Sequence, residues 1–172
     1  MNNHEIFVGM GELAVTADPA TVLLTIGLGS CVGVALLDPP RKIAGLAHVI
    51  FPDSGERSVD APGKYANTAV PALIDALVRL GAPAAGLFAV LVGGARMFKF
   101  ERSLNLDVGA RNIVAVHAHL RSARIPVRAE ATGGGTGRSI RVDAAGGVVG
   151  LREGGTDAEL YRAAAPPLAR IA

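Results

Sequence analysis

The chain has 172 residues, of which 50% are hydrophobic and 19% charged, with a formal net charge of +2. This length suits one well-packed domain over 1–172, and no apolar run approaches the roughly 20 residues of a membrane-spanning helix. Scattered basic residues and 4% aromatics exclude a typical nucleic-acid-binding surface. A single cysteine excludes an internal disulfide, and the first residues lack a secretory signal pattern, so we expect a cytoplasmic protein without membrane insertion.

The first third of the chain predicts strands around a tight turn. A short strand is expected near residues 9–11, and the β-branched run 21–26 predicts a longer one. Two apolar runs, 32–37 and 43–50, flank the segment 38–42, which has the proline and aspartate of a turn. We therefore predict an antiparallel hairpin.

This hairpin brings the only cysteine close to a histidine. If residues 38–41 form a four-residue loop, Leu37 pairs with Lys42 and Cys31 lies directly opposite His48. Opposed side chains have Cβ atoms roughly 4.5–5.5 Å apart, within reach of a thiolate–imidazole hydrogen bond. A shift of one residue would put them on opposite faces, so the predicted pairing depends on the register.

The residues alone support two interpretations of Cys31. Free cysteine is often an inert core residue, but the preceding segment 27–30 can bring backbone N–H groups near a thiolate and an oxyanion. His48 is either a hydrogen-bonded core residue or a base, and its register favours the base. Thr25 can form a hydrogen bond with the second ring nitrogen of His48 and complete a triad, although its place in a strand-like run alone fits an ordinary strand threonine.

Two helices and further strands follow. Apolar spacing predicts a helix over about 64–80, with Pro71 in its first turn or at a kink, and a second helix over 112–123. We expect short strands at the following positions: 86–92, 127–131, 139–142 and 148–151, the last three as a meander. A loose tail is expected from about residue 155. Because strands outnumber helices without alternating strictly with them, the predicted class is α+β.

A glycine-rich segment precedes the strand expected at 139–142. Residues 132–138 suggest a phosphate cradle but lack the Lys-Ser/Thr pair of a P-loop. A turn or a substrate-contact loop containing Gly134, Gly135 and Arg138 is the better interpretation. We find no set of ligands that predicts a metal site.

Several stretches together resemble the CheD family of chemoreceptor glutamine deamidases. They follow one another with family-like spacing as far as Leu151 and are 25–34, 45–48 with 51–52, 64–65, 93–98, 109–112 and 133–138. The resemblance implies a β-sheet sandwich flanked by two main helices, as in cytotoxic necrotizing factor deamidases. It also implies a hydrolase that converts selected glutamines on methyl-accepting chemotaxis receptors to glutamates and releases ammonia.

The resemblance assigns roles to individual residues. Cys31 matches the nucleophile, His48 the general base and Thr25 the third member of the triad, and we expect backbone N–H groups at Gly29 and Ser30 to hold the oxyanion. No cofactor or metal is expected. The family's partners are the receptors and, in many species, a CheC-type phosphatase. The alternatives are a non-catalytic adaptor that binds these partners and, more remotely, another thiol hydrolase.

Overall fold

The computed structural model describes residues 4–55, 57–97 and 107–164. Two helices and two sheets of five strands each make up most of it. The strands are β1 (His4–Phe7), β2 (Leu13–Thr16), β3 (Thr21–Leu28), β4 (Val32–Asp38), β5 (Ile43–Val49), β6 (Phe88–Gly93), β7 (Val127–Thr132), β8 (Arg138–Asp143), β9 (Val148–Glu153) and β10 (Thr156–Arg162). The helices are α1 (Ala66–Arg79) and α2 (Val108–Ser122), and the short 3-10 helices are η1 (Pro39–Arg41), η2 (Pro62–Lys64) and η3 (Ala84–Gly86).

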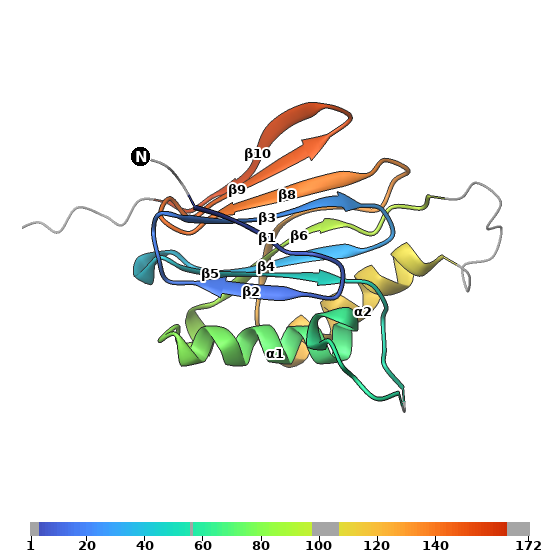
Figure 1. Cartoon of the computed structure of the whole chain (residues 1–172), viewed down its shortest axis with the longest axis horizontal. Helices are drawn as coiled ribbons and strands as arrows, with labels where there is room; N and C mark the ends of the chain where they lie inside the picture. Colours follow the sequence, from blue (N-terminus) through green and yellow to red (C-terminus); the bar gives the residue numbers. More distant parts are fainter. Residues whose placement is uncertain (1–3, 56, 98–106, 165–172) are drawn as a thin grey trace, which may run out of the picture.

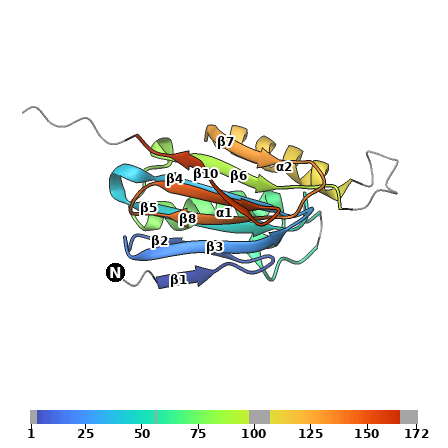
Figure 2. The ribbon, with the colours of Figure 1, turned by 90° about the horizontal axis from the view of Figure 1, so that it is seen from above.

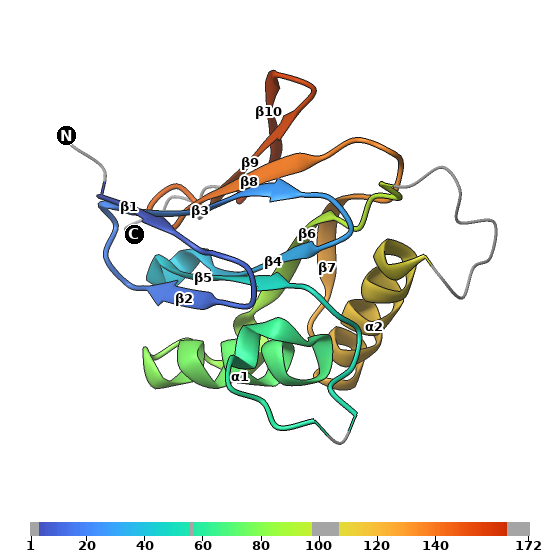
Figure 3. The ribbon, with the colours of Figure 1, turned by 45° about the vertical axis from the view of Figure 1, so that its right-hand side comes forward.

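The elements form three layers. One sheet has the strand order β1-β3-β8-β9-β10 and the other β2-β5-β4-β6-β7, and the two pack face to face. Both helices cover the outer face of the second sheet, where α1 contacts β5 and β2 and α2 contacts β4 (Figures 1 and 3). Seen from above, β1 and β3 lie along one side of the molecule and β7 and α2 along the other (Figure 2). The predicted α+β class and the sandwich are confirmed, although both helices lie on the same side. In the part of the chain described, no helix has the length and apolarity needed to cross a bilayer.

The sheet β2-β5-β4-β6-β7 is covered by the helices on one face and by the other sheet on the opposite face, which explains why its central strands are almost entirely apolar. Every residue of β4 and β5 is buried. Ala44 and Leu46 of β5 pack toward the other sheet, in a cluster with Leu23 and Ile140. Ala47 and Val49 pack on the helices instead, so successive side chains of β5 alternate between the two cores, as strand geometry requires.

The predicted β4–β5 hairpin is present, but its predicted register is wrong by two residues. Asp38 pairs with Ile43 and Gly33 pairs with His48. Asp38 is buried, and its carboxylate oxygen Oδ2 forms an ion pair with Nη1 of Arg41 at 3.1 Å, so Asp38 stays in the strand. Lys42 closes the turn with a left-handed φ of 56°. Because the shift is an even number of residues, no side chain changes face.

Long-range pairing corrects three other predictions. Residues 9–11, predicted as a strand, form the connection between β1 and β2. β7 does not join a meander with β8 and β9, because α2 carries the chain across to pair β7 parallel with β6. Residues 156–162, predicted as part of a loose tail, form β10, which is held by antiparallel pairing with β9. The end of that tail, 165–172, lies outside the described residues.

The first helix falls within its predicted range of about 64–80, whereas the second begins four residues before the predicted Asn112. α1 starts at Ala66 and contains Pro71 in its interior. α2 starts at Val108 because the Asp107 carboxylate caps it, accepting a hydrogen bond from the Ala110 N–H at 3.0 Å. The other carboxylate oxygen pairs with Arg96 Nε at 2.9 Å. The hydrogen bond from Ala110, and secondarily Arg96, lower the pKa of Asp107.

Replacing this cap is expected to destabilise the protein. Asp107→Ala should lower the free energy of unfolding by about 1 kcal/mol, the usual value of an N-cap. Asp107→Asn retains an acceptor for Ala110 and should lose less. Because folding lowers the pKa of Asp107, its charge stabilises fully above the ordinary value of 3.8, and this stabilisation is lost as the pH falls through the folded value. Urea unfolding at neutral pH measures the free energy of unfolding of both variants. If both lose the same amount of stability, the effect belongs to the ion pair with Arg96 instead of the cap.

Candidate active site

Residues from both sheets meet between the layers at one end of the sandwich. His48 lies on the same face of β5 as Ala44 and Leu46, so its ring points toward the other sheet. Thr25 of β3 meets it there, with Thr25 Oγ1 2.8 Å from His48 Nδ1. Cys31 follows β3, precedes β4 and packs against the same inter-sheet cluster. The predicted contact between Thr25 and the imidazole is therefore present, and Cys31 borders the same inter-sheet core.

The hydrogen bonds of Thr25 determine the tautomer of His48. The Thr25 hydroxyl also lies 2.7 Å from the carbonyl oxygen of Val8, which can only accept. The hydroxyl must therefore donate to Val8 and accept from an N–H at Nδ1 of His48. The lone pair of the neutral ring is then on Nε2, a buried atom for which the described residues provide no hydrogen-bond partner. Nε2 is free to accept a proton.

Cys31 is a diagonal neighbour of His48 rather than its direct partner. The residue opposite His48 is Gly33, and a Cβ at that position would lie 2.9 Å from a methyl group of Leu28. Cys31 lies two positions before Gly33, where diagonal neighbours are separated by roughly 7–8 Å. Within the described part of the chain no hydrogen bond joins the thiol to Nε2. Catalytic hydrogen bonds of this kind commonly tighten only when substrate is bound.

The loop that carries the thiol is held by its carbonyl groups. Three successive carbonyl oxygens accept hydrogen bonds from other segments: Gly29 from Ala95 N at 2.7 Å, Ser30 from Asn112 Nδ2 at 2.9 Å and Cys31 from Gly94 N at 2.7 Å. Gly93 makes the last of these contacts possible, since it has a φ of 112° and any Cβ there would overlap the Cys31 carbonyl oxygen. The loop is therefore anchored at three successive carbonyl groups.

Its N–H groups are arranged differently from the prediction. The Gly29 N–H already donates to the Gly27 carbonyl at 3.0 Å, so it is not available to an oxyanion. No backbone carbonyl of the described residues accepts from the N–H groups of Ser30 and Cys31. A trans peptide points its N–H away from its C=O, so each of these two N–H groups points away from the segment that anchors the preceding carbonyl. Of the N–H groups predicted to hold an oxyanion, that of Gly29 is therefore already used and that of Ser30 donates to no backbone carbonyl of the described residues.

The glycine-rich segment lies beside this loop, but Arg138 is turned into the protein. Gly134 accepts a hydrogen bond from Arg96 N at 2.8 Å, next to the Gly94 and Ala95 anchors. The guanidinium of Arg138, which is 9% exposed, donates to the Gly133 carbonyl at 2.6 Å and pairs with Glu153 at 2.9 Å. These contacts favour a role in shaping the loop, and they leave Gly134 and Gly135 as the exposed candidates for substrate contact.

Burial keeps the thiol and the imidazole neutral. It raises the pKa of Cys31, an effect opposed by the residue's own backbone N–H. It also lowers the pKa of His48, an effect opposed by the Val8 carbonyl and by the charge of Glu12. Both shifts disfavour a thiolate–imidazolium pair at rest. The site therefore suits an attack in which the proton moves from sulfur to Nε2 as the substrate reacts.

Comparison with known proteins identifies the family. Residues 50–153 match the family model CheD, described as CheD chemotactic sensory transduction. The chain is 43% identical over 153 residues to the chemoreceptor glutamine deamidase CheD of Thermotoga maritima, covering 89% of this chain and 94% of that one. The chain belongs to the CheD family. The predicted resemblance is confirmed, although Phe98 of its motifs lies outside the described residues.

Other similar proteins extend the comparison. A probable chemoreceptor glutamine deamidase CheD from Clostridium botulinum is 42% identical over 154 residues, 88% of this CheD-family chain and 94% of that protein. Among solved structures, the hypothetical protein YfiH of Bacillus licheniformis has a TM-score of 0.46 and 16% identity, covering 77% of this chain and 59% of that one.

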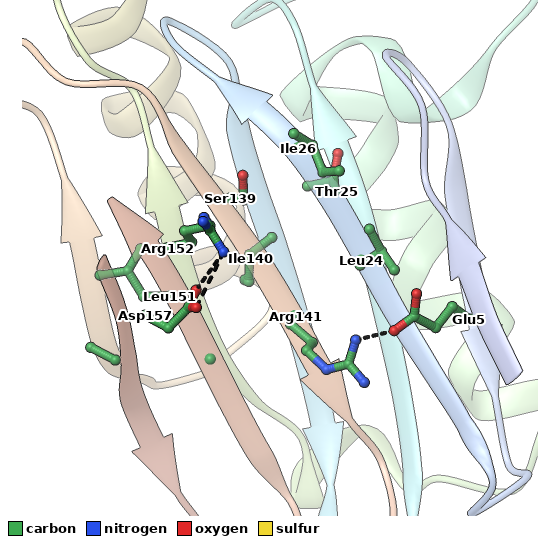
Figure 4. A pocket seen from close by; sticks show the side chains of 12 residues that line it. Glu5, Leu24, Thr25, Ile26, Ser139, Ile140, Arg141, Leu151, Arg152 and Asp157 are labelled. Atoms are coloured by element: carbon green, nitrogen blue, oxygen red, sulfur yellow. Dashed lines mark hydrogen bonds and ion pairs between the residues drawn. The ribbon is translucent and has the colours of Figure 1, made fainter. Parts of the chain in front are cut away.

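Hollows near the thiol loop offer space for a substrate of this CheD-family chain. A small one of about 50 Å³ is lined by Ser30, Ala95, Met97 and Val108. Val108 also lines a neighbouring hollow of about 420 Å³ with Phe51 and Arg111. A third hollow of about 340 Å³ lies on the outer face of the sheet that contains β3, β8 and β9. The ion pairs Arg141–Glu5 and Arg152–Asp157 form part of its lining (Figure 4). His48 points to the opposite face of that sheet, so the third hollow is not part of this site.

Sequence reasoning missed two residues of this CheD site. The Val8 carbonyl, which orients Thr25, could not have been found, because a backbone acceptor has no signature in a sequence. Asn112 had a signal, since it is a polar residue on the buried stripe of α2 that also contains Gly109 and Val116. Its two long-range hydrogen bonds became visible only in three dimensions.

Replacing Thr25 is expected to test its contact with the imidazole. Thr25→Val removes the hydroxyl, leaving the Val8 carbonyl and the His48 N–H without their partner, and should cost about 1–3 kcal/mol of stability. Loss of ring orientation should also lower the kcat of deamidation roughly 10- to 100-fold. Thr25→Ser keeps the hydroxyl and should restore most of both. Thermal unfolding and ammonia release measure the two effects, and a Thr25→Val variant with wild-type kcat would exclude Thr25 from the triad.

Proposed function

We propose that this chain is a cysteine-dependent chemoreceptor glutamine deamidase, which hydrolyses side-chain amides of selected receptor glutamines to glutamates and ammonia. The observation that carries the proposal is the 43% identity over most of both chains with the Thermotoga maritima protein of that name. The site supports it with an accessible thiol, an imidazole with a free buried nitrogen and two unpaired backbone N–H groups in one region of the described structure.

The first half of the reaction forms a thioester. His48 Nε2 accepts the proton of the Cys31 thiol while Sγ attacks the carbonyl carbon of the glutamine amide. The N–H groups of Ser30 and Cys31 hold the resulting oxyanion. When the tetrahedral intermediate collapses, the C–N bond breaks and the imidazolium returns its proton to the leaving nitrogen, which departs as ammonia.

The second half consumes water. His48 Nε2 accepts a proton from a water molecule, whose oxygen attacks the thioester carbonyl. The C–S bond then breaks and releases glutamate, and the imidazolium gives its proton to the departing Sγ, which restores the thiol and the neutral ring. In both halves the Thr25 hydroxyl, oriented by the Val8 carbonyl, holds the His48 N–H and keeps Nε2 as the reactive nitrogen. These residues accomplish the whole cycle without a metal or an organic cofactor.

The proposal also names partners and a location. Methyl-accepting receptors are the substrates, and a CheC-type phosphatase is a further partner implied by the family. The proposal places the protein in the cytoplasm, a reducing compartment that suits the free thiol of Cys31.

Intact-mass measurement tests the function directly. A purified cytoplasmic fragment of a receptor from the same organism is incubated with the protein, and peptide mapping locates each glutamine that becomes glutamate. Conversion should be accompanied by one ammonia per glutamine. A receptor fragment that binds the protein but is neither converted nor a source of ammonia would contradict the proposal and identify a non-catalytic adaptor.

A further inference from the structure

One polar side chain in the second helix is buried where the helix packs on the sheet. Asn112 has 0% exposure and lies among Gly109, Val116 and Leu120, the other buried residues of α2. A side-chain amide in such a place is unfavourable unless its hydrogen bonds are made. Its two hydrogen bonds through Nδ2 therefore explain why an apolar residue does not occupy the position, although Oδ1 is buried without a partner among the described residues.

Asn112 uses its nitrogen to join two distant backbone segments. Nδ2 donates to the Ser30 carbonyl at 2.9 Å and to the Ile50 carbonyl at 2.8 Å, 82 and 62 residues away in the sequence. Because both neighbours are acceptors, the nitrogen must be the atom that faces them. Ser30 immediately precedes Cys31, and Ile50 follows His48 by two residues. One amide thus ties the segment of the nucleophile to the strand of the base.

The hydrogen bond to Ser30 also orients the next N–H. The Ser30 carbonyl and the Cys31 N–H belong to one planar trans peptide and point in opposite directions. With the carbonyl held by Asn112, the Cys31 N–H faces away from the helix. The same N–H counteracts the effect of burial on the pKa of the Cys31 thiol. No backbone carbonyl in the described chain accepts from this N–H.

We propose that Asn112 is a positioning residue for the deamidation. It orients the Cys31 N–H toward the thiol and the developing oxyanion by holding the Ser30 carbonyl. It keeps the strand of His48 in place beside the nucleophile by holding the Ile50 carbonyl. The inference rests on the proposed function, and it assigns the buried amide a part in the reaction that packing alone does not require.

A graded pair of variants tests the proposal. Asn112→Leu is close in volume and donates nothing, so kcat should fall roughly 10- to 100-fold while KM stays within about two-fold, because the oxyanion contact exists only in the transition state. Asn112→Asp, kept protonated by burial, can donate to one carbonyl only and should lose less. If Asn112→Leu does not fold, the Asn112→Asp variant still measures the effect.

A second readout needs no substrate. Alkylation of the single cysteine by iodoacetamide at about pH 8.5 should slow by roughly three- to ten-fold in Asn112→Leu, because a thiolate that loses its N–H partner forms less readily. Val116→Ala, one turn along the same buried stripe, is the matched control: it loses packing but no donor, and at equal folded fraction it should keep the wild-type kcat and alkylation rate.

Two outcomes would overturn the inference. The first is an Asn112→Leu variant with wild-type kcat and alkylation rate, and the second is equal loss in Val116→Ala at equal folded fraction. If wild-type protein converts no receptor glutamine, the proposed function fails instead. The alkylation rates then still decide whether Asn112 orients the Cys31 N–H.

Discussion

Cys31→Ser is expected to lower the rate of receptor deamidation by roughly 10⁴-fold or more, as loss of a nucleophile does in comparable hydrolases. A serine hydroxyl is far less ionised than a thiol, and the neutral His48 of this site provides no strong base to compensate. The substitution is nearly isosteric at a half-buried position, so the thermal midpoint should change little. Ammonia release from the purified receptor fragment measures the loss.

The single cysteine provides a sharp control for this experiment. Iodoacetamide has only one thiol to modify, so alkylated wild-type protein should lose activity in proportion to the modified fraction. Any residual activity of Cys31→Ser should be insensitive to the same reagent. Substantial turnover by Cys31→Ser, or by fully alkylated protein, would show that sulfur is not the nucleophile.

His48→Gln is expected to lower kcat by roughly 10²- to 10⁴-fold, the usual contribution of a general base. Glutamine can still hydrogen-bond Thr25 but cannot take a proton. In the wild type, His48 must be unprotonated, and burial lowers its pKa, so kcat/KM should persist below the ordinary value of 6.5 and fall only at more acidic pH. In His48→Gln this acid limb should disappear, and residual activity should rise with pH toward the raised pKa of Cys31, above 9.0.

A second histidine offers the matched control. His117 lies on α2, partly exposed, and pairs with Glu130 at 2.8 Å away from the inter-sheet site. His117→Gln should therefore keep the wild-type pH profile. An acid limb that survives in His48→Gln, or a wild-type midpoint above 6.5, would contradict the assignment of His48 as the base.

The same burial affects folding. Because the pKa of His48 is lowered in the folded state, protonation favours the unfolded chain, and the loss of stability begins as the pH falls below 6.5. Near neutral pH the ring is neutral in both states and contributes no such penalty. The enzyme should therefore lose activity and stability over neighbouring ranges on the acid side.

Local sequence was sufficient for the elements whose ends are marked by turn residues. The hairpin of β4 and β5 follows from apolar runs on either side of Pro39 and Pro40, and the two amphipathic helices follow from their spacing. The family motifs were equally readable, because they place Cys31, His48 and Thr25 in recognisable segments. These features rest on residues close together in the chain.

Tertiary contacts decided the rest. Asp38 stays in its strand because it is buried beside Arg41, and this moves the register by two residues. β10 forms because β9 offers it an edge, although its own residues are mostly exposed and polar. Such choices depend on burial and pairing energies that local propensity does not contain.

The chemistry divides in the same way. The sequence by itself determined which side chains can react, since a thiol, an imidazole and a hydroxyl are properties of residue types. Only the tertiary structure decided which ring nitrogen of His48 is free and which N–H groups next to the thiol donate to no backbone carbonyl. Those depend on Val8, Asn112, Gly94 and Ala95, which reach the site from distant segments, and a hydrogen bond is defined by distance and direction in space rather than by separation along the chain.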